Sequence, residues 1–107
     1  MGLFSRKQEE AKVVMASDRL IIEQMVDDDA KAAHLVDKLK EGNPLILNFD
    51  GLDQMILNKF LAFFAGAAYA LDGKTVLINN TTYLFAKKID FMDGSLQKFI
   101  QNLPKSK

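Results

Sequence analysis

Phe60-Leu-Ala-Phe-Phe-Ala-Gly-Ala-Ala-Tyr-Ala-Leu71 is the stretch that decides the fold of this chain, since it carries no charge and Asp72-Gly73 follows it at once. Its twelve residues are too few to cross a bilayer, which needs about 20. On a helix, Ala62, Gly66 and Ala70 fall four apart and form one stripe of small side chains. A helix that is apolar all round must be covered on all sides. In so short a chain, we expect a second copy of the protein to supply part of that cover.

The composition is typical of one globular domain. The chain has 107 residues, of which 49% are hydrophobic, and its formal net charge is zero. Zero net charge gives no footprint for nucleic-acid binding, and the absence of cysteine excludes disulfides and zinc–thiolate sites. We therefore expect a cytoplasmic protein with one core domain over residues 12–107. Residues 1–11 are expected to be a flexible N-terminus; the alternative is a small membrane-surface anchor, because Leu3 and Phe4 stand next to basic residues.

Hydrophobic periodicity and turn residues predict an alternation of strands and helices. In the first half of the chain we predict a strand at 12–16, an ambiguous segment at 20–26, a helix capped at 27–29 and running to about 40, and a strand at 45–49. A second helix, capped by Asp53, runs from 54 to about 70. It is followed by a hairpin with arms at 75–78 and 82–85, a short edge strand at 89–91 and a last helix that begins at 94–95. This order indicates a two-layer α/β sandwich. We expect a mixed sheet of four to five strands with the two main helices packed on one face, and a short C-terminal helix.

Residues that could carry catalysis or hold a cofactor are sparse. His34 is the only histidine, and without cysteine it lacks the usual partners of a metal site. The Asp27-Asp28-Asp29 cluster lacks calcium-loop spacing, the glycines lack the spacing of a phosphate-binding loop, and no serine lies in a nucleophile elbow. We therefore expect no enzymatic activity, no cofactor and no metal site.

Aromatic residues gather near the end of the second helix and in the hairpin; they are Tyr69, Tyr83, Phe85 and Phe91. Core packing is one interpretation of this cluster. An apolar groove for a short peptide is another, since aromatic anchors commonly carry such contacts, and Lys87-Lys88 could contact acidic residues there. A small-molecule pocket lined by Tyr69, Tyr83 and Phe85 is the third interpretation, and it would make the chain a small regulatory or ligand-binding domain.

The second helix and the turn after it resemble a known signature. Gly66-Ala-Ala-Tyr-Ala-Leu-Asp-Gly73 is similar to the Gly-x-x-Tyr-Ala-x-x-Gly core of SepF, a family of bacterial division-ring anchors. The segment Lys38–Phe49 looks like the end of that family's first helix and its second strand, and Tyr83-Leu84 resembles its hairpin. The likeness extends over about residues 12–103, nearly the whole chain.

The resemblance implies a non-enzymatic adaptor. SepF proteins dimerise and assemble further, bind the C-terminal tail of the tubulin-like protein FtsZ, and tether it to the cytoplasmic membrane through an N-terminal amphipathic helix. By this likeness, the chain would act at the division site as a dimer or polymer. The implied residues are Ala62, Gly66, Ala70, Lys59 and Phe63 for the dimer interface, Tyr83, Phe85, Tyr69 and Leu77 for the FtsZ tail, and Leu3 and Phe4 for the membrane.

The chain departs from the SepF pattern at several positions. Lys59 and Ala62 replace the usual Arg and Asp of the second helix, and Leu77 stands where a basic residue is common. Ala86-Lys87 replaces a Thr-Pro pair after the aromatic strand. These departures favour self-association more than tail binding. They keep open a self-assembling module that makes no contact with FtsZ.

Overall fold

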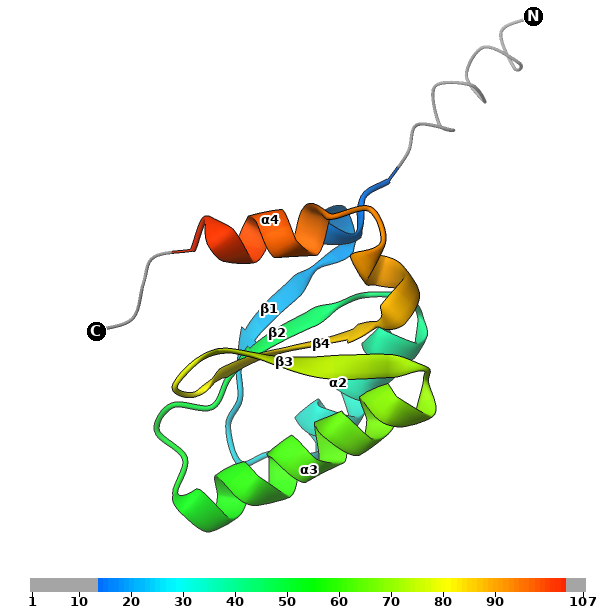
Figure 1. Cartoon of the computed structure of the whole chain (residues 1–107). Helices are drawn as coiled ribbons and strands as arrows, with labels where there is room; N and C mark the ends of the chain where they lie inside the picture. The colour runs from blue at the N-terminus through cyan, green and yellow to red at the C-terminus, as the bar shows by residue number, and fades with distance from the viewer. Residues whose placement is uncertain (1–13, 104–107) are drawn as a thin grey trace, which may run out of the picture.

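The computed structural model describes residues 14–103, in which strands alternate with helices (Figure 1). A short 3-10 helix lies near each end of this part of the chain. The elements in chain order are η1 (Ala16–Arg19), β1 (Ile21–Gln24), α2 (Asp29–Lys40), β2 (Leu45–Asn48), α3 (Gln54–Ala70), β3 (Gly73–Asn79), β4 (Thr82–Lys87), η2 (Lys88–Phe91) and α4 (Ser95–Gln101).

The strands form one mixed sheet of four strands in the order β1-β2-β4-β3. β1 and β2 are parallel, with Ile21 opposite Leu45, so that α2 is the crossover between them. β4 is antiparallel to both of its neighbours, and its Tyr83 lies between Leu47 on β2 and Leu77 on β3. The hairpin therefore brings its second arm to the centre of the sheet and leaves its first arm, β3, at an edge.

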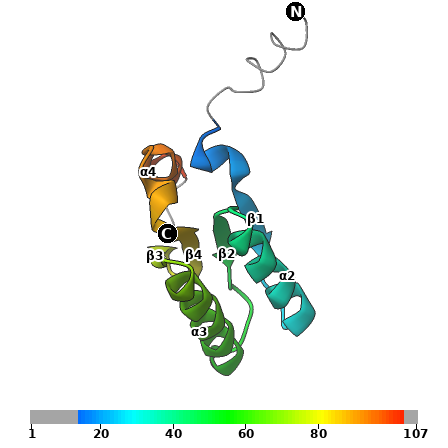
Figure 2. The ribbon, with the colours of Figure 1, turned by 90° about the vertical axis from the view of Figure 1, so that its right-hand side faces the viewer.

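The two main helices share one face of the sheet, as predicted. Figure 2 shows α2 and α3 below the strands and α4 above them. Below the sheet, one core cluster joins both helices to the strands; its members include Leu35, Leu39, Leu45, Leu47, Phe49, Phe60, Phe64 and Phe85. Above the sheet, a second cluster joins η1 and α4 to the strands. Its members include Ala16, Ile46, Leu84, Ala86 and Leu96. Alternation along β2 and β4 sends successive side chains to opposite clusters.

Both main helices begin at the predicted caps. The Asp28 carboxylate accepts a hydrogen bond from the backbone N–H of Lys31 at 3.1 Å, and the Asp53 carboxylate accepts one from Ile56 at 3.0 Å. Side-chain acceptors at these positions satisfy N–H groups that the helix itself leaves free. The two predicted main helices and the two arms of the predicted hairpin, β3 and β4, are confirmed.

The first predicted strand is wrong over its described part. The strand was expected at 12–16, but residues 14–15 are irregular and Ala16 begins the 3-10 helix η1. The backbone N–H of Ala16 donates to the Asp93 carboxylate at 2.9 Å, so its partner is a side chain far along the chain and not a neighbouring strand. The ambiguous segment at 20–26 supplies the first strand instead, as β1.

The short edge strand expected at 89–91 is also wrong. These residues lie in the 3-10 helix η2, which ends with the backbone N–H of Met92 donating to the carbonyl of Ile89 at 3.2 Å. Phe91 packs against the cluster above the sheet, whereas Ile89 is exposed. The alternation of Ile89 and Phe91 predicts a strand. Packing of the Phe91 ring against the cluster above the sheet stabilises a 3-10 helix there instead.

Candidate functional site

The small side chains of α3 form an open surface on the helix. Ala62, Gly66 and Ala70 are all exposed, on the side of the helix opposite the buried Phe60 and Phe64. A Cβ added to Gly66 would meet no atom within 4 Å. The protomer therefore does not need a glycine at this position for its own packing, although glycine in a helix interior costs about 1 kcal/mol relative to alanine.

Gly73, the second glycine of the signature, is in the opposite situation. A Cβ added there would lie 2.4 Å from the carbonyl oxygen of Ala86 on β4 and 2.9 Å from that of Ala68 on α3. Both distances are shorter than real Cβ contacts. Gly73 is thus required by the close approach of the helix end to the hairpin, and the fold of one protomer explains it.

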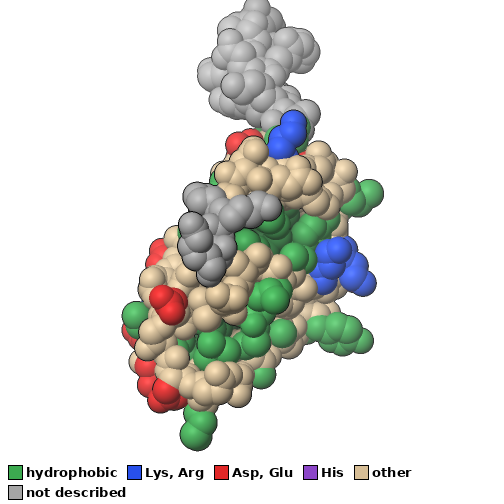
Figure 3. All heavy atoms as spheres, turned by 60° about the vertical axis from the view of Figure 1, so that its left-hand side comes forward, with side chains coloured by type: hydrophobic (Ala, Val, Ile, Leu, Met, Phe, Trp, Pro, Cys, Tyr) green, Lys and Arg blue, Asp and Glu red, His purple; other side chains and the backbone are tan. Residues whose placement is uncertain are grey.

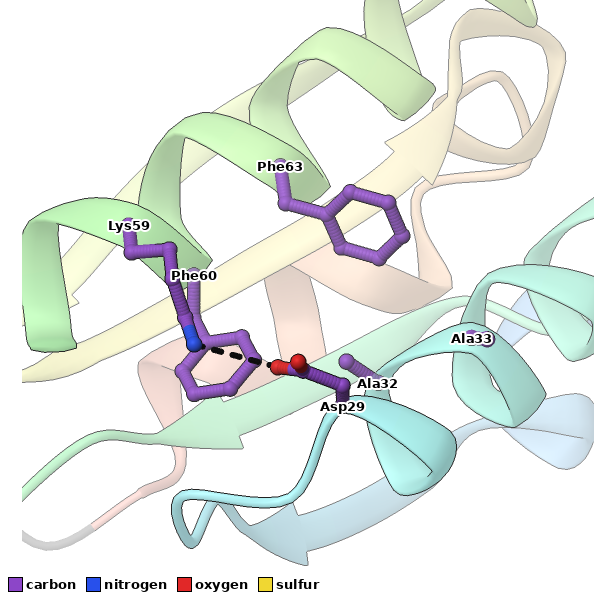
Figure 4. Close-up of a pocket in the computed structure, with 6 residues that line it drawn as sticks. All are labelled: Asp29, Ala32, Ala33, Lys59, Phe60 and Phe63. Carbon is purple, nitrogen blue, oxygen red and sulfur yellow. Dashed lines mark hydrogen bonds and ion pairs between the residues drawn. The ribbon is translucent and has the colours of Figure 1, made fainter.

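A groove runs between α2 and α3, beside the stripe of small residues. It has a volume of about 340 Å³ and is lined almost wholly by apolar atoms. In Figure 4, the ring of Phe63 points from α3 across the groove toward α2, where Ala32 and Ala33 form the other wall. Phe63 is 44% exposed, an unusual value for a phenylalanine on a helix with a well-packed inner face. A helix laid on the stripe would also cover this groove.

Lys59 closes the groove at one end by joining α3 to the start of α2. Its Nζ lies 3.1 Å from the Asp29 carboxylate and 3.6 Å from that of Asp27, and 4.4 Å from the centre of the Phe60 ring. The hydrogen bond to Asp29 raises the pKa of Lys59 above its ordinary value of 10.5. Lys59 thereby links the second turn of α3 to the start of α2.

The α2 side of this surface was not predicted from the sequence. Asp29, Ala32 and Ala33 line the groove, yet the predicted interface residues all lie on α3. A signal was present, since Ala30-Lys-Ala-Ala33 is a second cluster of small residues on a helix. Of this cluster, the hydrophobic periodicity assigns only Ala32 to a face, the buried one, where the structure also places it.

The four predicted tail-binding residues do not lie together on one surface. Phe85 is fully buried, with its ring 5.4 Å from that of Phe64, and offers no surface to a ligand. Tyr83 is half-buried against Phe49, at 5.7 Å between ring centres. Leu77, paired with Tyr83 across the ladder, is 59% exposed at the sheet edge.

Tyr69 lies at the other end of β3 from this pair. It is 84% exposed near the end of α3, from which the chain enters β3 at Gly73. Leu77 is four residues further along β3, or about 13 Å in an extended strand. The structure thus brings together Leu77 and Tyr83, leaves Tyr69 as a separate exposed aromatic residue, and places Phe85 in the core. A pocket lined jointly by Tyr69, Tyr83 and Phe85 is not compatible with this arrangement.

In the part of the chain from 14 to 103, no three His, Asp or Glu side chains gather closely enough to hold a metal ion. Over the same residues, no helix combines the length and the apolar character needed to span a bilayer. Leu3 and Phe4, the predicted membrane contacts, lie outside the described residues.

Comparison with known proteins supports the resemblance seen in the sequence. The sequence model of the family described as cell division protein SepF matches residues 24–88, which run from the end of β1 through the hairpin to the first residue of η2. The match covers both helices that line the groove and both glycines of the signature. The chain belongs to the SepF family of cell division proteins.

Individual relatives carry the same description. A cell division protein SepF from Carboxydothermus hydrogenoformans is 32% identical over 65 residues, which are 61% of this chain and 47% of that protein. One from Symbiobacterium thermophilum is 34% identical over 80 residues, 75% of this chain and 36% of the relative. One from Ruminiclostridium cellulolyticum is 27% identical over 103 residues, 92% of this chain and 65% of the relative. The chain thus spans about half the length of the first of these relatives.

Proposed function

We propose that this chain is a non-enzymatic division adaptor that self-associates through α3 and binds the C-terminal tail of FtsZ at the division site. The observation that carries the proposal is the contrast between the two signature glycines. Gly73 is enclosed by backbone atoms of its own protomer, whereas Gly66 faces open space. A glycine that its own protomer does not use is expected where a second backbone comes close.

The surroundings of Gly66 fit a helix-to-helix contact between two copies. Ala62 and Ala70 lie one turn to either side of Gly66 and are exposed, so a partner helix meets little relief along the stripe. Phe63 and the apolar groove beside it supply area that such a contact would bury. A two-fold axis through this surface presents the same patch on both protomers and so makes a closed dimer.

A dimer would strengthen weak contacts with a polymer. Each protomer has its own Leu77 and Tyr83 at the hairpin, so a dimer presents two tail-binding surfaces. When one tail of an FtsZ filament is bound, the second surface meets neighbouring tails at a high effective concentration. Each contact can then be weak while the dimer stays on the filament.

Light scattering on a charged variant of the stripe tests the self-association. Gly66→Lys places an ammonium group where two backbones are proposed to meet, and we expect it to convert the dimer into monomers. His34→Lys is the matched control, because His34 is exposed on α2 and is not part of the groove lining. An unchanged dimer in Gly66→Lys would remove α3 from the interface.

Membrane attachment is tested on the segment before the described residues. Liposomes of anionic lipid are sedimented with the full chain and with a chain that lacks residues 1–11. If Leu3 and Phe4 anchor the protein, the full chain sediments and the shortened chain stays in the supernatant. Equal sedimentation of the two would show that residues 1–11 do not anchor the protein.

A further inference from the structure

The two edges of the sheet differ in how they are protected against further strands. β1, at one edge, has four residues and is guarded by Lys31, whose Nζ lies 2.9 Å from the backbone oxygen of Gln24 and 3.2 Å from the carboxylate of Glu23. Short length and charged neighbours are the usual means by which natural sheets block unwanted pairing. The β1 edge is therefore closed.

β3, at the other edge, is less protected, because its one charged side chain, Lys74, lies near the start of the strand and its one irregularity lies near the end. It has seven residues, and the run from Thr75 to Ile78 is uncharged. Within residues 14–103, β3 is paired to β4 alone, so the N–H and C=O groups on its outer side face away from the sheet. The one irregularity lies between Leu77 and Asn79, next to the turn, and leaves the register of Gly73–Leu77 regular. The regular, uncharged stretch from Thr75 to Leu77 is a template for one more strand.

Apolar side chains flank the β3 edge on both faces of the sheet. On the helix side, Leu77 is 59% exposed and half-buried Tyr83 lies behind it. On the other side, Val76 and Ile78 are half-buried against the cluster under α4. Figure 3 shows apolar side chains across this side of the molecule, with basic side chains at its right-hand border. An extended peptide, whose side chains alternate between faces, could use both sets of contacts.

The charge at one end of β3 indicates the chemistry of the occupant. Lys74 is exposed, with its Nζ 4.5 Å from the centre of the Phe91 ring. The exposed Lys88 pairs with Asp72 at 3.6 Å, whereas the Nζ of Lys87 donates to the carbonyl oxygen of Lys40 at the end of α2, at 3.0 Å. Lys74 and Lys88 against the single Asp72 leave this end positive. It complements a carboxylate, and it would repel a basic segment.

We propose that the tail of FtsZ adds to the free edge of β3 as a fifth strand, with an apolar side chain against Leu77 and an acidic one beside Lys74. This inference rests on the proposed function, because it names the binding mode of the same tail. Lys74 lies three residues before Leu77, about 10 Å away and on the opposite face of the sheet, so the acidic and the apolar side chain of the tail are expected an odd number of residues apart.

Backbone-modified peptides test the binding mode directly. The probe is a fluorescein-labelled peptide of about fifteen C-terminal residues of FtsZ from the same organism, long enough to pair with all of β3, titrated with the full chain. Two further peptides carry N-methyl groups on alternate residues, one set on odd and the other on even positions. Only alternate N–H groups of a strand face its neighbour, so one set should weaken binding about tenfold or more and the other should bind as the unmodified peptide does.

Charge variants test the orientation of the tail. Lys74→Glu should weaken binding, and a peptide whose acidic residue is changed to lysine should restore it. Lys38→Glu on α2 is the control and should bind the unmodified peptide normally. If the unmodified peptide binds but both N-methylated sets bind equally, strand addition is wrong while tail binding stands. If the unmodified peptide does not bind, tail binding itself is refuted, and this inference with it. If Lys74→Glu dissociates the dimer without peptide, the edge belongs to a second copy and the inference is overturned.

Discussion

Replacing Gly66 by alanine separates a role in the protomer from a role between protomers. Within one protomer the added Cβ meets open space, and Gly66 lies in the interior of a 17-residue helix at a non-positive φ. Alanine is favoured over glycine in a helix interior by about 1 kcal/mol. For a domain of this size, that gain raises the melting temperature by about 4–8 °C. The isolated protomer of Gly66→Ala should therefore be more stable than the wild type.

Between protomers the same change has the opposite sign. A two-fold interface receives the added methyl group twice, once from each copy. Overpacking a close contact costs about 1–3 kcal/mol. A cost of about 2 kcal/mol corresponds to a dimer dissociation constant raised about thirtyfold. Gly66→Ala should therefore yield a more stable protomer that dimerises more weakly.

Two measurements separate these effects. Sedimentation equilibrium over a concentration series gives the dissociation constant, and thermal unfolding at concentrations below it gives the stability of the monomer. His34→Ala is the control, because it changes an exposed residue of α2 away from the groove and should leave dimerisation unchanged. A stabilised protomer with an unchanged dissociation constant would refute the reasoning about α3. A destabilised monomer would show that Gly66 serves the fold of its own chain.

Further substitutions test the packing of the protomer itself. Gly73→Ala should lower the free energy of unfolding in urea by about 3 kcal/mol, because the new Cβ would press on backbone oxygen atoms. Arg19→Met should cost about 3 kcal/mol in the same assay, because it leaves the carboxylate of Asp90 buried without its ion pair, and Arg19→Met combined with Asp90→Leu should recover most of that loss. The Asp93 carboxylate accepts hydrogen bonds, the most important of them from the backbone N–H of Ser95, and these hold the pKa of Asp93 below its ordinary value of 3.8. The ionised carboxylate therefore stabilises the folded protein above pH 3.8, and this stabilisation is lost as the pH falls through the lowered pKa. The urea midpoint of Asp93→Asn should accordingly change less than that of the wild type between pH 5 and pH 3, and equal changes would contradict this assignment.

Local signals were sufficient for the two main helices and the hairpin. Asp28 and Asp53 lie in sequence beside the N–H groups that they cap, so each helix start can be read from a few neighbouring residues. The run Leu45–Leu47 is apolar on both faces because both faces of β2 are covered, and that pattern is visible without a structure. Elements whose stability is local or periodic were predicted correctly.

The error at the first predicted strand, 12–16, occurs where the stabilising partner lies far along the chain. η1 is held by Asp93 and Ser95, whose side chains accept hydrogen bonds from the backbone N–H groups of Ala16 and Ser17. The partners in these bonds are 77 and 78 residues apart. No short stretch of sequence around Ala16 contains these partners, so the β-branched run at 13–14 by itself predicts a strand.

The sequence alone determined the family, the apolar helix with its small-residue stripe, and the order of the main elements, because periodicity, caps and a spaced signature are properties of neighbouring residues. Tertiary structure alone decided that Gly73 is enclosed while Gly66 is open, since the difference depends on where Ala86 and Ala68 lie in space. It also decided that Phe85 is buried while Leu77 is exposed, because β4 lies at the centre of the sheet and β3 at its edge. Strand order is a matter of which segments meet, and no local pattern contains it.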